Sequence, residues 1–227
     1  MDWNNDGKKD LIAGDTAGNV WVFLNIGTKG KPELAEGKRV EVDGKLITAE
    51  RKIYKKVEGK YVLDKIIPGS HPLAERFSKI HFADWDADGL KDLLVGHIKN
   101  IIWYKNIGTD SAPRFRTPTL IKVPEGGLPL KPSPHVIDWD GDGTKDLLMG
   151  SEKPEIYFYR NIGTNKQPLL ARGEILDLRG PGFEKGYRCR IGVTDWNNDG
   201  KVDLLVGNRV KGEKPSSGGN MWLFLGK

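Results

Sequence analysis

The chain has 227 residues, a formal net charge of +5 and one cysteine, Cys189. This length suits one domain with a sizeable core. A single cysteine excludes an internal disulfide, and Cys189 is expected to be a small buried residue. No run of residues is apolar enough to span a membrane, so membrane insertion is not expected.

The chain opens on the first of four copies of the pattern D-x-[DN]-x-D-G-x-x-D, here called loops 1 to 4, which begin at residues 2, 84, 138 and 195. Positions 1, 3, 5 and 9 carry carboxylate or amide oxygens, and the glycine at position 6 allows the positive φ of a sharp turn. The backbone carbonyl at position 7 adds a further oxygen. Clustered carboxylates repel one another unless a cation neutralises them, and calcium takes six to eight oxygens in flexible geometry.

The sequence therefore predicts about four Ca²⁺ ions, one for each loop. A plain Asp/Gly-rich turn needs no aspartate at position 9, and an EF-hand needs a glutamate at position 12, where all four loops have an apolar residue. The predicted ligands are Asp2, Asn4, Asp6, Lys8 and Asp10; Asp84, Asp86, Asp88, Leu90 and Asp92; Asp138, Asp140, Asp142, Thr144 and Asp146; and Asp195, Asn197, Asp199, Lys201 and Asp203.

Each loop is followed by the same series of predicted strands. A short leucine-rich strand (residues 11–14, 93–96, 147–150 and 204–207) comes first, and an aromatic strand (20–24, 101–104, 156–159 and 221–225) comes next. Three copies continue into Asn-Ile-Gly-Thr at residues 25, 106 and 161. With one strand before each later loop and one after Asn-Ile-Gly-Thr, the pattern predicts about four strands per unit, the loop joining the first to the second.

The spacing of the loops predicts a β-propeller. Successive loops start 82, 54 and 57 residues apart, and four strands in about 40 to 60 residues are typical of a propeller blade. The long first step contains an insertion at 35–79 with two predicted hairpins, which turn at Asp43-Gly44 and Glu58-Gly59. We expect a single domain over 1–227, with repeats at 1–79, 80–133, 134–189 and 190–227.

These blocks resemble the FG-GAP/VCBS repeats, the calcium-loop propeller repeats of integrin α-subunit heads and many bacterial secreted proteins. The resemblance covers residues 1–32, 80–123, 134–170 and 190–226. It implies an all-β propeller of four-stranded blades with calcium at the motif positions. The family serves adhesion, glycan binding and, as an accessory domain, enzymes.

The first and last units look incomplete, because no strand precedes Asp2 and no fourth strand follows residue 225. Open blade edges are an aggregation liability. The expectations are a piece of a larger propeller, a ring closed by pairing of the two ends, or a ring completed by another copy through self-association.

The charge balance favours an anionic partner. The loops hold 14 of the 31 acidic residues, so four bound Ca²⁺ ions would raise the formal charge from +5 to +13. We expect an acidic polysaccharide or another cell-surface polymer, while a lysine-coated surface that only keeps the chain soluble is the alternative. No nucleic-acid-binding motif is present. Moderate-affinity calcium sites fill outside cells, which predicts a secreted protein.

Residues that break the repeat are the candidates for ligand binding. His97 stands where the other units have Asp15, Ser151 and Asn208, and a long loop near the C-terminus carries Lys211 and Lys214. Variable surface loops without function are the alternative. By contrast, the tryptophan at position 2 of every loop is expected to pack between blades and order the loop rather than stack on sugars. These four are Trp3, Trp85, Trp139 and Trp196.

No motif identifies an enzyme. The chain lacks Gly-x-Ser-x-Gly, His-Glu-x-x-His and a phosphate-binding glycine loop. A polysaccharide lyase would need a base, and the sequence does not group the candidates His81, His97, His135 and Tyr187. The sequence thus predicts a secreted, calcium-stabilised binding or adhesion module; the alternatives are a polysaccharide lyase or accessory domain and a structural repeat unit that assembles into a larger propeller.

Overall fold

A computed structural model describes residues 1–28, 30–69, 73–116, 118–124, 126–180, 183, 186–210 and 218–226. These residues form strands and connecting segments without a helix, which confirms the all-β class. The chain divides into two compact units, Met1–Asp84 with Gly89–Ile121 and Trp85–Asp88 with Lys122–Lys227. Within the described part, no helix has the length and apolar character needed to cross a membrane.

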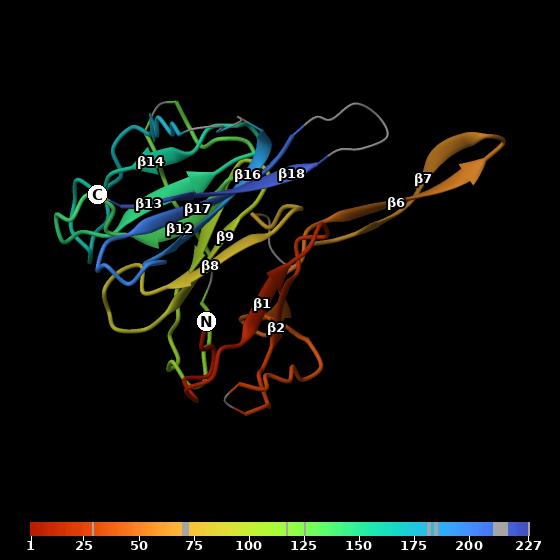
Figure 1. The fold of residues 1–227 in the computed structure, drawn as a ribbon. Helices are drawn as coiled ribbons and strands as arrows, with labels where there is room; N and C mark the ends of the chain where they lie inside the picture. Colours follow the sequence, from red (N-terminus) through yellow and green to blue (C-terminus); the bar gives the residue numbers. More distant parts are fainter. Residues whose placement is uncertain are drawn as a thin grey trace. The chain divides into compact units, whose positions relative to one another are not determined.

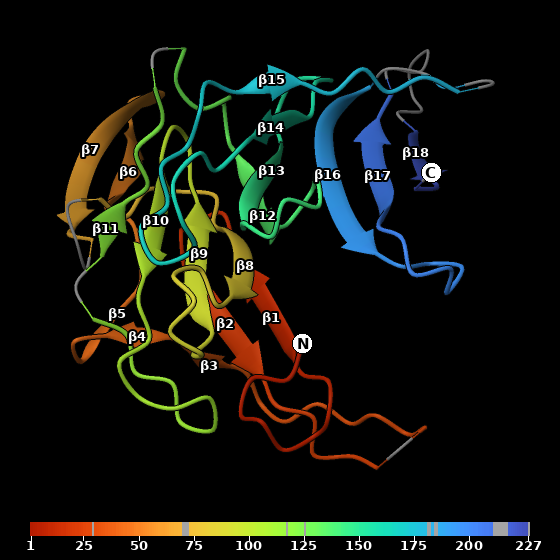
Figure 2. The same ribbon diagram turned by 90° about the vertical axis from the view of Figure 1, so that its left-hand side faces the viewer.

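The first unit contains two blade-like antiparallel sheets, as Figure 2 shows. One has three strands in the order β1-β2-β3 and corresponds to the first repeat. The other has four strands in the order β11-β10-β9-β8 and corresponds to the second repeat. Their bounds are β1 Leu11–Gly14, β2 Val20–Phe23, β3 Lys38–Arg39, β8 Lys79–Ala83, β9 Asp92–Gly96, β10 Ile101–Tyr104 and β11 Thr119–Leu120.

The second unit contains the sheets of the third and fourth repeats. The third sheet has four strands in the order β12-β13-β14-β15, and the fourth has three, β16-β17-β18. Four-stranded blades are thus present in the two middle repeats. The bounds are β12 Ser133–Ile137, β13 Asp146–Gly150, β14 Tyr157–Tyr159, β15 Glu174–Ile175, β16 Tyr187–Thr194, β17 Asp203–Arg209 and β18 Gly219–Phe224.

The acidic loops occupy the predicted place in the sheets. In the third repeat the pair Ile137↔Asp146 closes the β12–β13 hairpin, so loop 3 is its connection. The equivalent closing pairs are Ala83↔Asp92 and Thr194↔Asp203. The aspartate at position 9 is therefore both the last residue of the loop and the first residue of a central strand.

The insertion forms the two predicted hairpins. The first pairs β4 (Glu41–Val42) with β5 (Lys45–Leu46), and the second pairs β6 (Arg51–Val57) with β7 (Lys60–Ile67). Asp43 and Gly44 have φ of 49° and 72°, and Glu58 and Gly59 have φ of 50° and 81°. Positive φ at both central residues is the type I′ turn that suits the twist of a two-residue hairpin. Figure 1 shows β6 and β7 as a long, thin ribbon.

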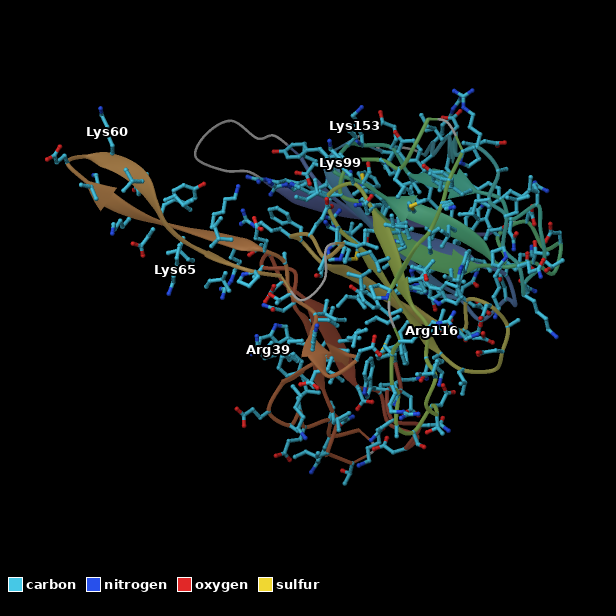
Figure 3. The ribbon with its side chains drawn as sticks, turned by 180° about the vertical axis from the view of Figure 1, so that it is seen from behind. Arg39, Lys60, Lys65, Lys99, Arg116 and Lys153 are labelled. Carbon is cyan, nitrogen blue, oxygen red and sulfur yellow. The ribbon has the colours of Figure 1, made fainter. Side chains whose placement is uncertain are left out.

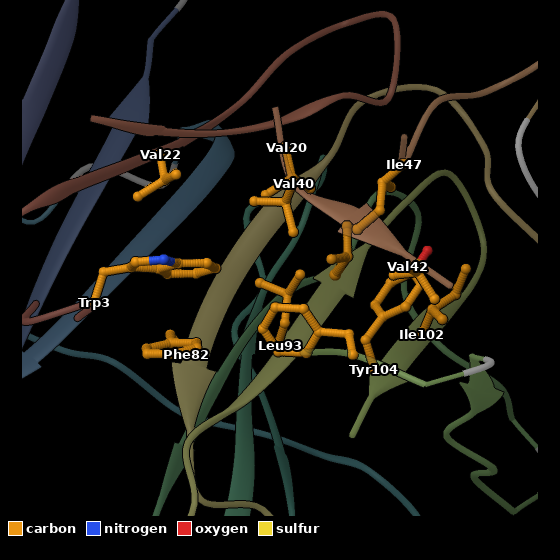
Figure 4. Close-up of a cluster of buried hydrophobic side chains, with 12 residues drawn as sticks. Trp3, Val20, Val22, Val40, Val42, Ile47, Phe82, Leu93, Ile102 and Tyr104 are labelled. Carbon is orange, nitrogen blue, oxygen red and sulfur yellow. The ribbon is translucent and has the colours of Figure 1, made fainter. Parts of the chain in front are cut away.

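A buried cluster joins the first two sheets and the insertion in the first unit (Figure 4). The ring of Trp3 stacks on Phe82 with centroids 4.8 Å apart, and its centroid lies 5.9 Å from that of Phe115. Leu93 and Ile102 belong to the same cluster and are fully buried. Trp3 therefore packs, as expected for position 2.

The other position-2 tryptophans do not all behave alike. Trp85 is 3% exposed, whereas Trp196 is 59% exposed. The indole of loop 4 thus has little cover from the described residues of its unit. An identical residue in every repeat does not have an identical environment here.

The Asn-Ile-Gly-Thr segment is a turn organised by its buried asparagine. In the third repeat the Asn161 Oδ1 atom accepts hydrogen bonds from the backbone N–H groups of Gly163 and Leu169, both at 3.0 Å. Asn25 and Asn106 make the equivalent pairs of bonds. A Cβ on Gly163 would lie 2.5 Å from the carbonyl oxygen of Gln167, so the motif needs a glycine for close approach of the two chain segments.

This turn gives a stability prediction. Asn161→Ala leaves two backbone N–H groups without their acceptor, so we expect the free energy of unfolding to fall by about 2–3 kcal/mol. Asn161→Asp keeps the acceptor and should lose less. The measurement is urea unfolding with a chelator present, with Ile162→Ala as control because Ile162 is 60% exposed. Equal losses for Asn161→Ala and Ile162→Ala would contradict this role.

Candidate metal centres

All four loops have the backbone conformation that the glycine at position 6 predicts. The φ angles of Gly7, Gly89, Gly143 and Gly200 lie between 82° and 92°. Position 4 is also left-handed in every loop, with φ of 56°, 55°, 75° and 58° at Asn5, Ala87, Gly141 and Asn198. Sequence reasoning missed this second bend, although asparagine or glycine at three of the four positions was its signal.

In loops 2 and 3, the structure brings three carboxylates of the same loop close together. One oxygen from each of Asp138, Asp140 and Asp146 lies within 4.8 Å of the others in loop 3. In loop 2 the same holds for Asp84, Asp86 and Asp88. Calcium–oxygen distances of 2.3–2.6 Å place ligands on opposite sides of one ion about 4.6–5.2 Å apart. Both groups therefore have dimensions that fit a single calcium ion.

Loops 1 and 4 have asparagine at position 3, but like Asp84 and Asp138 their position-1 aspartates bond to the loop backbone. Their position-1 carboxylates accept hydrogen bonds from the backbone N–H groups at positions 5 and 6, as Asp2 does from Asp6 and Gly7 at 3.1 and 2.9 Å. The same two bonds to Asp195 are 3.0 and 2.9 Å. Among the described residues, close groups of three carboxylates occur only in loops 2 and 3.

One atom of loop 1 nevertheless supports a cation there. The Oδ1 atom of Asn4 is buried and accepts no hydrogen bond from the described residues, while its Nδ2 donates to Asp6 at 3.2 Å. A buried acceptor without a donor is unfavourable. An oxygen-seeking ion held by the loop would satisfy it.

In loops 1, 3 and 4 the position-5 aspartate receives a local hydrogen bond that favours its charged form. The backbone N–H of Lys8 donates to Asp6 at 2.9 Å and lowers the pKa of that carboxyl. Lys201 does the same for Asp199, and in loop 3 the hydroxyl and N–H of Thr144 lower the pKa of Asp142. The position-7 residues thus hold the loop with their N–H groups, and their carbonyls stay predicted ligands.

The position-9 aspartate has a second role that the sequence did not reveal. The carboxylate of Asp146 accepts the backbone N–H of Trp139 at 3.0 Å and that of Asn161 at 2.7 Å. It therefore ties the start of loop 3 to the end of the aromatic strand. Asp10 makes the same two bonds, and Asp203 makes them with Trp196 and Gly226. Asp92 accepts the N–H of Asn106 at 2.8 Å.

The environment of Asp146 shows what a cation would relieve. Burial raises the pKa of Asp146, the two backbone donors oppose that rise, and the negative charges of Asp140 and Asp142 add to it. Arg160 offsets part of this charge with an ion pair to Asp140 at 2.7 Å. The group thus carries more negative charge than its own protein partners neutralise, which favours a divalent cation.

The residues predicted to bind a ligand lie in different settings. His97 is fully buried, and burial lowers its pKa to about 4, with the charge of Lys79 adding to the effect. In the third repeat the residue at the same strand-end position stabilises the following turn. There the Ser151 hydroxyl donates to the carbonyl of Lys153 at 3.1 Å and accepts its backbone N–H at 3.0 Å. We therefore leave His97 out of the ligand surface proposed below. Lys211 and Lys214 lie outside the described residues.

The comparison with protein families agrees with the repeated loops and strands. The profile of the FG-GAP-like repeat matches residues 84–149 and 138–206, more than half of the chain. The chain belongs to this family. No curated protein matches the sequence of this FG-GAP-like repeat protein. A solved chain of the Photorhabdus luminescens Tc holotoxin pore aligns at 17% identity with a TM-score of 0.45, over 96% of this chain and 8% of that one.

A pair of variants separates the two roles of loop 3. Asp146→Asn replaces an acceptor with a donor opposite a backbone N–H, so we expect a loss of about 1–3 kcal/mol in unfolding free energy even with a chelator present. Asp140→Asn weakens an ion pair with the half-exposed Arg160 and one exposed loop hydrogen bond, so it should cost less than about 1 kcal/mol under chelation. It should instead weaken calcium binding by about tenfold or more, because site charge sets affinity. Calorimetric titration and urea unfolding measure both. A reversed pattern would refute the assignment.

Buried His97 predicts acid sensitivity. Its folded pKa of about 4 lies below the ordinary value of 6.5, so the unfolded chain binds protons more readily as pH falls. The stabilisation from the neutral ring is complete above pH 6.5 and is lost toward pH 4. Between pH 7 and pH 5 we expect the free energy of unfolding to fall by about 2 kcal/mol more in the unsubstituted protein than in His97→Gln. Urea unfolding across this range with a chelator present tests it, and parallel pH profiles would contradict it.

Proposed function

We propose that this FG-GAP-like repeat protein is a secreted binding module whose sheets are stabilised by calcium and whose surface recognises an anionic glycan or a similar cell-surface polymer. The observation that carries the proposal is the convergence of carboxylate oxygens in loops 2 and 3 at the spacing of calcium ligands. Loops 2, 3 and 4 each join two strands of one sheet, so a bound ion would hold that hairpin closed.

The distribution of charge supports an anionic partner. The aspartates of the loops face one another and the loop backbone, and bound calcium would neutralise them. The remaining charges are then dominated by 36 lysine and arginine residues. A protein with this excess attracts polyanions and binds them faster at low salt. Uncharged polymers would not be attracted by this excess of positive charge.

The export proposal follows from the type of site. Loops built on aspartate, asparagine and backbone oxygens resemble extracellular calcium modules, which bind the ion at about 10⁻⁴–10⁻³ M. Such sites are filled where calcium is abundant and are largely empty in cytosol. A module that needs calcium for stability would therefore work outside the cell.

Thermal unfolding with and without calcium tests the first part. At one hundred times the dissociation constant each site adds about 2.7 kcal/mol, and about 2–4 °C in Tm follows from each kcal/mol at this size. The double variant Asp86→Asn/Asp140→Asn removes one carboxylate from each of loops 2 and 3, so it should lose part of the shift, while loops 1 and 4 keep their contribution. An identical Tm in calcium and chelator would refute calcium stabilisation.

Binding to immobilised polymers tests the second part. Polygalacturonate and dextran sulfate should bind the calcium-loaded protein, with affinity falling as salt rises, whereas uncharged dextran should not. Equal binding to uncharged dextran, or binding to none of the three, would refute recognition of an anionic polymer.

A further inference from the structure

We propose that the β6–β7 hairpin and the groove at its base form the surface that binds an acidic polysaccharide. This inference rests on the proposed function and adds the site and the residues. It concerns only residues of the first unit, and no metal loop takes part in it.

The hairpin concentrates the positive charge of the chain. Residues 51–67 carry six cationic side chains and two acidic ones, a formal charge of +4 where the whole chain has +5. Lys55 pairs with Asp64 at 2.9 Å. In the described part of the chain, no hydrogen bond or ion pair engages the side-chain amine of Lys52, Lys56 or Lys60. These cations are therefore available to an external anion.

Exposed aromatic and apolar side chains lie among these cations. Lys56 is directly opposite Tyr61 and Tyr54 is directly opposite Leu63, so the strand register places all four on one side of the ribbon. Tyr54, Tyr61 and Leu63 are 53%, 75% and 49% exposed. Side chains this exposed are not part of the protein core, and grouped exposed apolar side chains mark an interaction surface. A tyrosine ring offers an apolar face and a hydroxyl, which suits the apolar face and hydroxyl edge of a sugar ring.

The base of the hairpin adds a concave site. A groove of about 380 Å³ is lined by Arg51, Lys52, Tyr54 and Arg76, with Thr16 and Glu50 among the other residues. Arg76 is fixed there, because its Nε donates to the carbonyl oxygen of Thr16 at 3.3 Å and its guanidinium lies 5.3 Å from the Phe77 ring centroid. Three cations around one acid favour a carboxylate or sulfate group.

The same features argue against a lipid surface. A hairpin that enters a bilayer needs one apolar face or an apolar tip, but this turn carries Glu58 and Lys60. The strand register places Lys56 and Lys60 on opposite sides of the ribbon, and Figure 3 shows Lys60 and Lys65 pointing in opposite directions from the twisted hairpin. A flexible polymer can contact charges on both sides of a ribbon, which a bilayer plane cannot do.

The choice between polysaccharide and single-stranded nucleic acid rests on the calcium loops and on the aromatic residues. Nucleic-acid grooves stack successive bases on several aromatic rings, whereas this surface offers two tyrosines separated by lysine and leucine. A module that needs calcium for stability would also be folded outside the cell, where it would meet acidic polysaccharides. Nucleic acid is therefore an outcome that the experiment must be able to reveal.

The test compares two variants with the same loss of charge. Lys52→Gln/Lys56→Gln/Arg76→Gln removes cations from the hairpin and groove, and Lys31→Gln/Lys122→Gln/Lys166→Gln removes exposed cations elsewhere. With calcium-loaded protein and polygalacturonate, we expect about a tenfold or larger loss of affinity for the first variant and about twofold or less for the second. Tyr54→Ala/Tyr61→Ala should weaken binding about fivefold even at high salt, where charge is screened.

Each result has one meaning. Equal losses for the two charge variants, with wild-type binding intact, would overturn the hairpin site and leave the proposed function standing. Wild-type protein that binds no anionic polymer would overturn the proposed function itself. Single-stranded DNA that displaces polygalacturonate at lower concentration than polygalacturonate displaces itself would overturn the polysaccharide assignment. Unchanged Tm values establish that the variants are folded, because the altered side chains are exposed.

Discussion

The buried carboxylate at position 9 is the interaction on which each repeat depends. In repeats 2 to 4 it begins a central strand. In repeats 1, 3 and 4 its two oxygens accept backbone N–H groups from the start of the acidic loop and from a residue just after the aromatic strand. Because an unpaired buried charge is far more costly than a paired one, loop, second strand and third strand must form together. The asparagine of Asn-Ile-Gly-Thr then extends the network, since its backbone donates to the carboxylate and its side chain orders the next turn.

This arrangement explains why a candidate cation site lies beside the position-9 carboxylate. Once Asp146 is buried and bonded to two amides, further aspartates in the same loop add negative charge that raises its pKa. The loop adapts in two ways. In all four loops the position-1 carboxylate accepts backbone N–H groups. Loops 1 and 4 have asparagine at position 3, whereas loops 2 and 3 keep a third carboxylate close by. Charge density therefore differs among the repeats, and loops 2 and 3 have the greater need for an ion.

The sequence predicted features that short-range chemistry determines. Loop position, strand order and the turns at Asp43-Gly44 and Glu58-Gly59 follow from residues near one another in the chain. Features set by distant segments were not predictable in this way. A polar residue at a strand end suggests an exposed rim, yet His97 is fully buried, and Trp3 and Trp196 share a motif position but not an environment. The two bonds of Asp146 were also hidden, because a motif records which residues recur and not which amides they meet.

Calcium and the hairpin surface are best understood as linked through stability rather than through charge. At physiological ionic strength, interactions between exposed charges fade beyond about 8 Å, so an ion in a loop alters the potential only near that loop. Formation of the hairpin from β6 and β7 is local, since a type I′ turn specifies it. The groove at its base is not local, because Thr16 and Arg76 are 60 residues apart and meet only when the first unit is folded. Ions that hold the sheets closed would therefore preserve the groove, while the exposed strands supply the contacts.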